Sequence, residues 1–183
     1  MNLPTKLFHY SSAPIKELRE DFHVEYKEIG LPYSKPRGLW ISIEDYGSQD
    51  INWRTWCEDQ DFRLEYLKYR YAVSLKKEAR ILHLASVQEL ECFSVIFQNE
   101  NLSSILKNHD GYIWSIDWES LRQIYDGIFI SPYQHKCRLL NPNTQWYYGW
   151  DCSSGCIWNI KMIDSFVLDS VTEPCQTVGS VKD

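Results

Sequence analysis

The order of short strand-like and helix-like segments constrains the fold of this chain more than any other feature of its sequence. Apolar or aromatic runs bounded by turn residues predict strands, and capping signals or 3.6-residue periodicity predict helices. The predicted strands are 6–12, 38–43, 69–75, 79–84 and 128–131, and the predicted helices are 14–22, a segment from 50, 86–97 and 117–124. The strands at 69–75 and 79–84 are separated only by a short polar connection, so we expect them to be neighbours. This order predicts an α+β domain rather than regular βαβ alternation.

The late part of the chain is rich in aromatic residues and glycine. Residues 145–150 and 155–158 are interpreted as two arms of one strand, interrupted at 151–154. From residue 169 onward the sequence is polar and weakly patterned, which is typical of a terminal tail. We therefore expect one domain over residues 1–168 and a polar C-terminal tail over 169–183.

Composition and charge limit the possible function classes. The residues are 44% hydrophobic and 15% aromatic, enough to build a sizeable core. The net charge of −6 argues against a general phosphate-binding surface, but it leaves room for a nucleic-acid substrate in one local groove. No stretch resembles a signal peptide or a membrane span. We therefore expect no membrane partner and a cytoplasmic site of action, or delivery into the cytosol of a host or target cell.

The six cysteines are scattered, and without a secretory signal they are interpreted as reduced thiols. A zinc site from Cys137, Cys152, Cys156 and His135 is an alternative, but the spacing lacks a paired short knuckle. A cysteine nucleophile is a further alternative, with no recognisable signature around any of the six. We expect no metal.

Two short segments carry side chains suited to binding a small polar ligand. His9, Tyr10 and Ser11 end the first predicted strand, where an imidazole and a hydroxyl can hold a sugar hydroxyl or an amide. An alternative is that His9 is a half-buried histidine satisfied by backbone groups. Before the second predicted strand, Gly38 permits a close backbone approach, and Trp40 offers a flat face for stacking. An ordinary turn feeding a core strand is the alternative for this segment.

Together these segments resemble the ADP-ribosyltransferase superfamily, in the histidine-containing branch of diphtheria toxin and the poly-ADP-ribose polymerases. The family has a first strand ending in His-Gly-Ser or His-Gly-Thr and a second strand with a Gly-Ile-Tyr-Phe-Ala-like run. Residues 9–11 and 38–42 are similar to these two elements, 125–128 are similar to a later Tyr-Asp-Gly-Ile strand, and Trp53 lies where the family has an aromatic-bearing helix. The resemblance covers residues 6–165 and implies a split β-sheet core with peripheral helices.

The resemblance also implies the roles of individual residues. His9 would bond the nicotinamide ribose, and the backbone around Tyr10 would grip the carboxamide of NAD. Trp40 would take the place of a tyrosine that stacks on nicotinamide, with Ser42 near the same pocket. The remaining members of the implied NAD site are Ser11, Gly38, Leu39, Trp53 and Ser154.

The catalytic carboxylate is where this sequence departs from the family. The family places a glutamate on a late strand, where it stabilises the oxocarbenium-like charge as nicotinamide leaves. No glutamate occurs here between Glu119 and Glu173. Asp151, between tryptophans and a Ser-Gly stretch, is the replacement that we expect, with Ser154 as the other candidate. The alternative is that Asp151 only caps its own turn.

The resemblance implies a mono-ADP-ribosyltransferase that uses NAD as co-substrate, releases nicotinamide and modifies a protein or nucleic-acid acceptor. Toxins, effectors and defence components of this size are common in the family. The alternative is an inactive relative that binds NAD, ADP-ribose or a protein. An RNA 2′-phosphotransferase on a related fold is a third hypothesis, and it is disfavoured because the pocket strands carry few basic residues.

Overall fold

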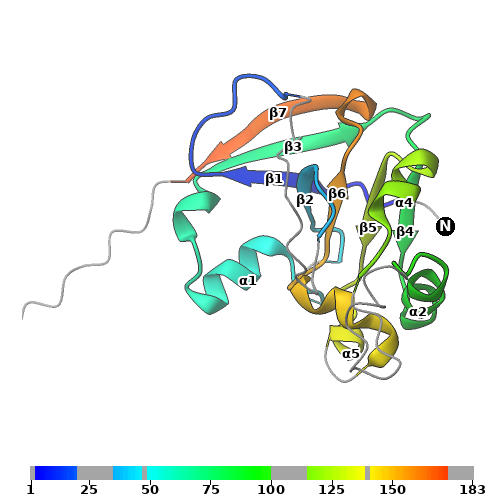
Figure 1. Ribbon diagram of the computed structural model, residues 1–183. Coiled ribbons are helices and arrows are strands. Elements are labelled where there is room, and N and C mark those ends of the chain that lie inside the picture. The colour runs from blue at the N-terminus through cyan, green and yellow to red at the C-terminus, as the bar shows by residue number, and fades with distance from the viewer. Residues whose placement is uncertain (1–2, 20–34, 47–48, 100–114, 139–140, 173–183) are drawn as a thin grey trace, which may run out of the picture.

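The computed structural model describes residues 3–19, 35–46, 49–99, 115–138 and 141–172. Seven strands form one mixed sheet in the order β4-β5-β6-β2-β1-β3-β7, and helices pack around it (Figure 1). The strands are β1 Leu7–Ser11, β2 Leu39–Ile43, β3 Tyr69–Leu75, β4 Ile81–Leu84, β5 Gly127–Ile130, β6 Ser154–Ile157 and β7 Ile163–Val171. Only β4 and β5 pair in parallel among these strands. The α+β class is therefore confirmed.

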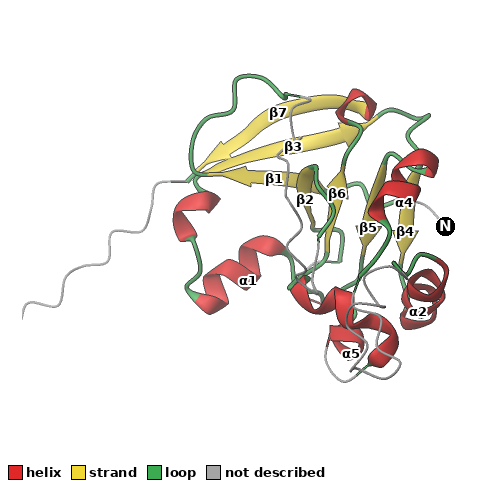
Figure 2. Cartoon of the chain, viewed as in Figure 1, coloured by secondary structure: helices red, strands yellow, loops and turns green. Residues whose placement is uncertain are grey.

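The sheet divides into two parts where β1 meets β2. These two strands pair only through Leu7 with Ile43 and Phe8 with Ser42, whereas β1 follows β3 over its whole length. Figure 2 shows β1, β3 and β7 running across the direction of β2, β6, β5 and β4. Beyond Phe8 the two parts diverge, and this divergence leaves space between the end of β1 and the start of β2.

The helices lie mainly beside the β4-β5-β6-β2 part of the sheet. The α-helices are α1 Trp53–Gln60, α2 Val87–Ile96, α4 Trp118–Ile124 and α5 His135–Arg138, and the 3₁₀ helices are η2 Leu64–Leu67, η3 Pro142–Gly149 and η4 Ile160–Met162. The largest apolar cluster joins α2, α4 and η3 to one face of β4 and β5, with Phe93, Trp118 and Trp146 at its centre. The Trp146 indole donates a hydrogen bond to Ser94 Oγ at 2.7 Å, which satisfies both buried groups.

A second apolar cluster lies on the other face and connects the two parts of the sheet. It contains Ile41 from β2, Val73 from β3 and Phe129 from β5, each almost fully buried. A third, smaller cluster packs α1 and η2 against β1 through Tyr10, Cys57 and Leu67. The position of α1 beside the end of β1 follows from this third cluster.

Most predicted elements are present, and side-chain caps begin three of the helices. Asn52 caps α1 with a reciprocal capping box to Thr55, Ser86 accepts from Glu89 N at the start of α2, and Asp117 accepts from Ser120 N at the start of α4. These short-range contacts are the part of the fold that local sequence specifies directly.

The expected pairing of 69–75 with 79–84 is wrong. β3 pairs with β1 and β7, while β4 lies at the far edge of the sheet beside β5. The buried carboxylate of Asp126, just before β5, accepts a hydrogen bond from Arg80 N at 2.8 Å, and Asp126 N donates to Arg80 O. These bonds fix the start of β4 against β5, so the polar connection is not a hairpin.

Two further expectations are corrected. Residues 145–149 belong to the 3₁₀ helix η3 rather than to a strand, and Trp150 follows its end. Asn141 caps the turn through Asn143 N, and both Trp146 and Tyr147 are buried instead of alternating. Residues 14–19 form no helix, and Ile15 N instead donates to the Tyr71 hydroxyl at 2.7 Å. Residues 20–22 of that predicted helix lie outside the described residues.

The C-terminal boundary also differs. β7 continues to Val171 and pairs with β3 up to Tyr69, so regular structure passes the expected domain end at residue 168. The sequence of β7 has no clear period-two pattern because several of its apolar side chains, including Val167 and Leu168, are exposed. The predicted tail from 173 to 183 lies outside the described residues.

Candidate functional site

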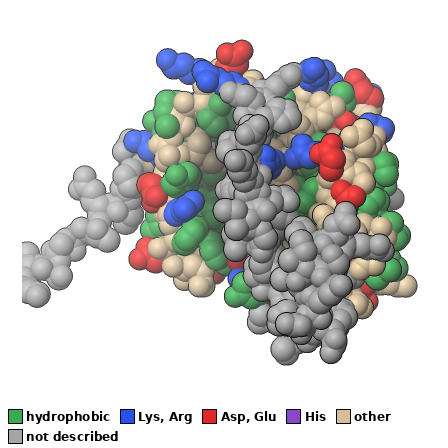
Figure 3. All heavy atoms as spheres, viewed as in Figure 1, with side chains coloured by type: hydrophobic (Ala, Val, Ile, Leu, Met, Phe, Trp, Pro, Cys, Tyr) green, Lys and Arg blue, Asp and Glu red, His purple; other side chains and the backbone are tan. Residues whose placement is uncertain are grey.

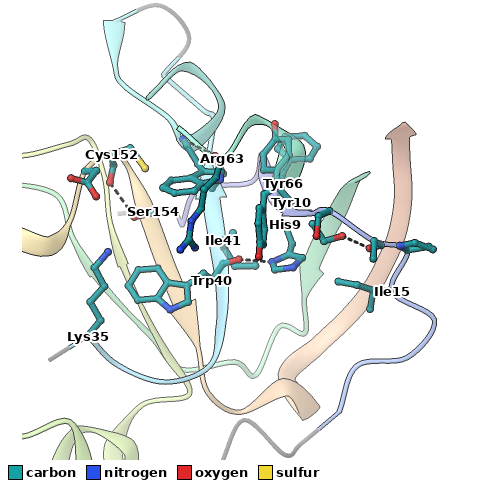
Figure 4. A pocket seen from close by; sticks show the side chains of 18 residues that line it. His9, Tyr10, Ile15, Lys35, Trp40, Ile41, Arg63, Tyr66, Cys152 and Ser154 are labelled. Atoms are coloured by element: carbon teal, nitrogen blue, oxygen red, sulfur yellow. Dashed lines mark hydrogen bonds between the residues drawn. The ribbon is translucent and has the colours of Figure 1, made fainter. Parts of the chain in front are cut away.

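A cavity of about 610 Å³ lies at the point where β1 and β2 diverge. Its walls come from the ends of these two strands, the segment after β1, the start of α1, the α1–η2 connection and the segment before β6 (Figure 4). The residues predicted from sequence that line it are His9, Tyr10, Ser11, Trp40, Ser42, Trp53, Asp151 and Ser154. Residues from both ends of the sequence therefore meet in one cavity.

Gly38 and Leu39 do not line this cavity. Leu39 is buried in the second apolar cluster, on the face opposite Trp40, because successive residues of a strand point to opposite faces. Gly38 has a φ of +153°, and a Cβ at this position would lie 2.4 Å from Ile157 O. Its role is to let β2 approach β6 closely, and not to contact a ligand in the cavity.

His9 is held by the strand beside it. Its Nδ1 lies 2.8 Å from the carbonyl oxygen of Trp40. Because a carbonyl oxygen can only accept a hydrogen bond, Nδ1 carries the proton and Nε2 is an acceptor. Burial lowers the pKa of His9 below 6.5, and the bond to Trp40 opposes this effect in part. The imidazole is therefore neutral near pH 7 and bridges the gap between β1 and β2.

The Tyr10 side chain points to the opposite face of β1 from His9, and its hydroxyl is used in a hydrogen bond within the protein. Its hydroxyl donates to Glu44 Oε1 at 2.8 Å, and Glu44 also accepts from Ser42 Oγ and Arg70. Burial and the neighbouring Glu44 charge raise the pKa of Tyr10. The Tyr10 ring thus forms part of the wall, and Ser42, which also accepts from Trp53 N at 3.2 Å, holds α1 against β2.

The indole of Trp40 is fixed by its neighbours. The Trp150 ring lies against it with centroids 4.9 Å apart at 61°, and Lys35 Nζ lies 4.9 Å from its centroid. A ligand ring that approaches from the Lys35 side would meet a cation. Trp53 contributes a second flat wall, stacked on Trp56 with centroids 5.4 Å apart.

Asp151 lines the cavity but already has a partner. Arg138 Nη2 donates to Asp151 Oδ1 at 2.6 Å, and the two side chains are 33% and 20% exposed. Such a pair persists because removing either partner leaves the other poorly solvated. Ser154, the other candidate, donates its hydroxyl to Cys152 O at 3.0 Å and contributes to the same wall.

The cavity residues that sequence reasoning did not predict include Lys35, Arg63 and Tyr66. Lys35 precedes β2, while Arg63 and Tyr66 belong to the connection after α1. No local pattern marks them, because only the packing of α1 and η2 against β1 brings this connection to the cavity. Arg63 has a left-handed backbone with φ 48°, which a sequence does not reveal for a non-glycine residue.

The buried cysteines of the described part of the chain have no reactive environment. Burial raises the pKa of the Cys57 and Cys152 thiols to about 12, which keeps both protonated at neutral pH. Within the same residues, no three His, Cys, Asp or Glu side chains gather closely enough to hold a metal ion. None of the helices described there is both long and apolar enough to cross a membrane.

Comparison with protein-family models, with curated proteins and with solved structures finds no match to this chain.

Proposed function

We propose that this protein is a mono-ADP-ribosyltransferase that binds NAD in the β1–β2 cavity and transfers ADP-ribose to a macromolecular acceptor. The observation that supports the proposal is the convergence of His9, Trp40 and Asp151, which are far apart in sequence, on one cavity. The divergence of β1 from β2 is also compatible with the ADP-ribosyltransferase-like split sheet that we propose for the core. The acceptor is a protein or a nucleic acid.

In this proposal the chain binds the nicotinamide ribose at the end of β1. His9 Nε2, the acceptor nitrogen, would take a hydrogen bond from a ribose hydroxyl, while the backbone of Tyr10 would hold the carboxamide. The bond from ribose C1′ to the nicotinamide nitrogen breaks, and nicotinamide leaves as a neutral molecule with the electron pair. The acceptor then forms a bond to C1′ and releases one proton.

Asp151 would stabilise the positive charge that develops on the ribose ring during this step. A fixed carboxylate in a partly enclosed site is effective because it needs no reorganisation as the charge forms. Arg138 must then hold Asp151 in place through Oδ1 while Oδ2 faces the ligand.

A second candidate function is an NAD- or ADP-ribose-binding module without transferase activity. The specific observation in its favour is the ion pair between Arg138 and Asp151, which neutralises the carboxylate that catalysis would need. Release of nicotinamide separates the two candidates.

The test is nicotinamide release from NAD by the purified protein, with cell lysate supplied as an acceptor source. We expect Asp151→Asn to slow release by about 100-fold or more, the usual effect of removing one preorganised charge-stabilising group. We expect His9→Gln to slow it as well, and Asp164→Asn, an exposed carboxylate on β7, to leave it unchanged.

The other outcomes are also informative. Release that persists in Asp151→Asn would move the catalytic role elsewhere, with Ser154→Ala the next variant. Binding of ADP-ribose without any nicotinamide release would contradict the transferase and favour the binding module.

A further inference from the structure

The connection from α1 to η2 holds two non-glycine residues in the left-handed backbone region. Asp61 has φ 48° and ψ 42°, and Arg63 has φ 48° and ψ 43°. Asp61 has a local reason for this conformation, because it ends α1 and its N–H donates to Cys57 O. Arg63 makes no side-chain capping bond to η2. Left-handed backbone at a non-glycine residue is strained, and such residues are concentrated at functional sites.

The conformation of Arg63 sends its side chain to the cavity. Figure 4 shows Arg63 and Lys35 reaching toward Trp40 from different sides. The Arg63 guanidinium lies 5.3 Å from the Phe62 ring centroid and 5.5 Å from that of Tyr66, which restricts its position. No carboxylate in the described part of the chain forms an ion pair with it.

Lys35 is a second cation without a carboxylate partner among the described residues. The carboxylate that most favours the charged form of Lys35 is Asp151, and its Oδ1 already accepts a hydrogen bond from Arg138. Although the Lys35 side chain as a whole is exposed, desolvation of its ammonium group lowers its pKa. Among the described residues neither Lys35 nor Arg63 forms an ion pair with a carboxylate, so both cations remain available to a ligand that supplies negative charge.

We propose that Lys35 and Arg63 form an anion-binding pair that holds the diphosphate of a nucleoside diphosphate ligand in this cavity. A guanidinium binds phosphate oxygens through two parallel hydrogen bonds, and an ammonium adds a compact charge. The aromatic walls at Trp40 and Trp53 suit the ring of the same ligand. A diphosphate matches two separated cations better than a single carboxylate does.

The inference deepens the proposed function and rests on it for the identity of the ligand. In NAD the nicotinamide ribose is joined directly to the diphosphate. When the diphosphate is bound by Lys35 and Arg63, the nicotinamide ribose would lie beside His9.

The surroundings of the cavity mouth fit a selective site rather than a general cationic surface. On the side that carries α1, the space-filling view shows hydrophobic side chains beside both basic and acidic ones (Figure 3). Phe62, Leu64 and Tyr66 are exposed in the segment after α1, and the same segment carries the exposed acidic residues Asp61 and Glu65. A polyanion would meet these carboxylates, whereas a small diphosphate inside the cavity would not.

The test measures binding of ADP-ribose, of inorganic pyrophosphate and of nicotinamide riboside by titration calorimetry. We expect Lys35→Met and Arg63→Gly each to weaken ADP-ribose and pyrophosphate binding by about 10-fold or more, the usual loss for a charge-assisted hydrogen bond. Binding of nicotinamide riboside, which lacks phosphate, is expected to change by less than about 2-fold.

The matched control is Asp61→Gly. Both glycine variants relieve a left-handed backbone, so both are expected to keep or raise the melting temperature. Only Arg63→Gly should lose affinity for pyrophosphate. A variant that loses affinity while melting at the wild-type temperature or above cannot owe that loss to unfolding.

The outcomes separate this inference from the transferase proposal. If wild type binds ADP-ribose through Lys35 and Arg63 but releases no nicotinamide, the cation pair stands and the transferase fails. If nicotinamide is released while both variants keep the wild-type affinity for ADP-ribose, the cation pair is overturned and the transferase stands. Wild-type protein that binds neither ADP-ribose nor pyrophosphate also overturns the inference.

Discussion

At the scale of single residues, the neutrality of His9 is the feature with the clearest physical consequence. Burial between the diverging strands disfavours the charged imidazole, and the hydrogen bond to Trp40 O compensates only in part. A neutral ring with its proton on Nδ1 presents Nε2 as an acceptor. The same burial makes the folded protein sensitive to acid.

We predict that protonation of His9 in the unfolded chain lowers the free energy of unfolding as pH falls below 6.5. The folded pKa lies below the unfolded one, so between these values the unfolded chain binds more protons and the free energy of unfolding rises with pH. The contribution is fully present above pH 6.5 and is lost as pH falls toward the folded pKa. Chemical denaturation from pH 7.5 to 5 measures it.

The control for this prediction is His135→Gln, which removes an exposed imidazole. His9→Gln should flatten the decline in unfolding free energy below pH 6.5, relative to both wild type and the control. An identical slope in His9→Gln and wild type would mean that His9 is not protonated preferentially in the unfolded chain.

The residues of the cavity differ in how far the sequence reveals them. His9, Trp40 and Asp151 were predicted because each lies in a short segment with a chemical pattern of its own. Arg63 was not, since its place in the cavity arises only when the α1–η2 connection packs beside β1. Lys35 was not predicted either, because no local pattern marks it as a cavity residue. The ion pair of Asp151 with Arg138 was also missed, because no local pattern marks Arg138 as the partner of this carboxylate.

At the scale of elements, local signals predict where a strand or helix lies better than they predict its neighbours. The strands β1, β2, β3 and β5 follow from apolar runs, but the place of β4 depends on Arg80 and Asp126, which are far apart in the sequence. The strand predicted over 145–150 failed for a related reason. Aromatic residues favour strands in general, and here Trp146 and Tyr147 are aromatic because the core beside α2 needs large buried rings.

Gly38 gives a prediction at the same scale, because it controls how β2 meets β6. A Cβ at residue 38 would lie 2.4 Å from Ile157 O and 2.9 Å from Cys156 Sγ, and φ is +153°. We expect Gly38→Ala to lower the free energy of unfolding by about 1–3 kcal/mol through backbone strain and overpacking. Urea denaturation monitored by circular dichroism measures the change.

Gly149→Ala is the matched control for Gly38→Ala. Its added methyl group would meet only the flexible Lys35 side chain, at 3.1 Å, so a loss well below 1 kcal/mol is expected. Equal losses in the two variants would show that the approach of β2 to β6 is not what requires glycine at residue 38.

At the scale of the whole molecule, charge and shape act together. The protein carries a net charge of −6, yet Lys35 and Arg63 project into its cavity. An acidic exterior repels nucleic acids in general, while a local pair of cations still attracts a small anion over a short range. If the proposed cation pair binds a diphosphate, this arrangement would favour a compact diphosphate over a long polyanion.

The two parts of the sheet share little backbone pairing, so the second apolar cluster must connect them. Ile41 lies in it with 1% of its surface exposed, between residues contributed by β3 and β5. We predict that Ile41→Ala lowers the free energy of unfolding by about 2–5 kcal/mol, because the cavity would form where both parts meet. Ile96→Ala, at a residue that is 71% exposed on α2, should cost far less.

The same variant tests whether the molecule unfolds as one unit. Tryptophan fluorescence reports mainly on the aromatic cluster beside α2, and far-ultraviolet circular dichroism reports on the whole sheet. If the second cluster couples the two parts, both transitions coincide in wild type and shift together in Ile41→Ala. Separate transitions in wild type would mean that the parts fold independently. The cavity between β1 and β2 would then widen without global unfolding, under conditions where the fluorescence transition has not begun.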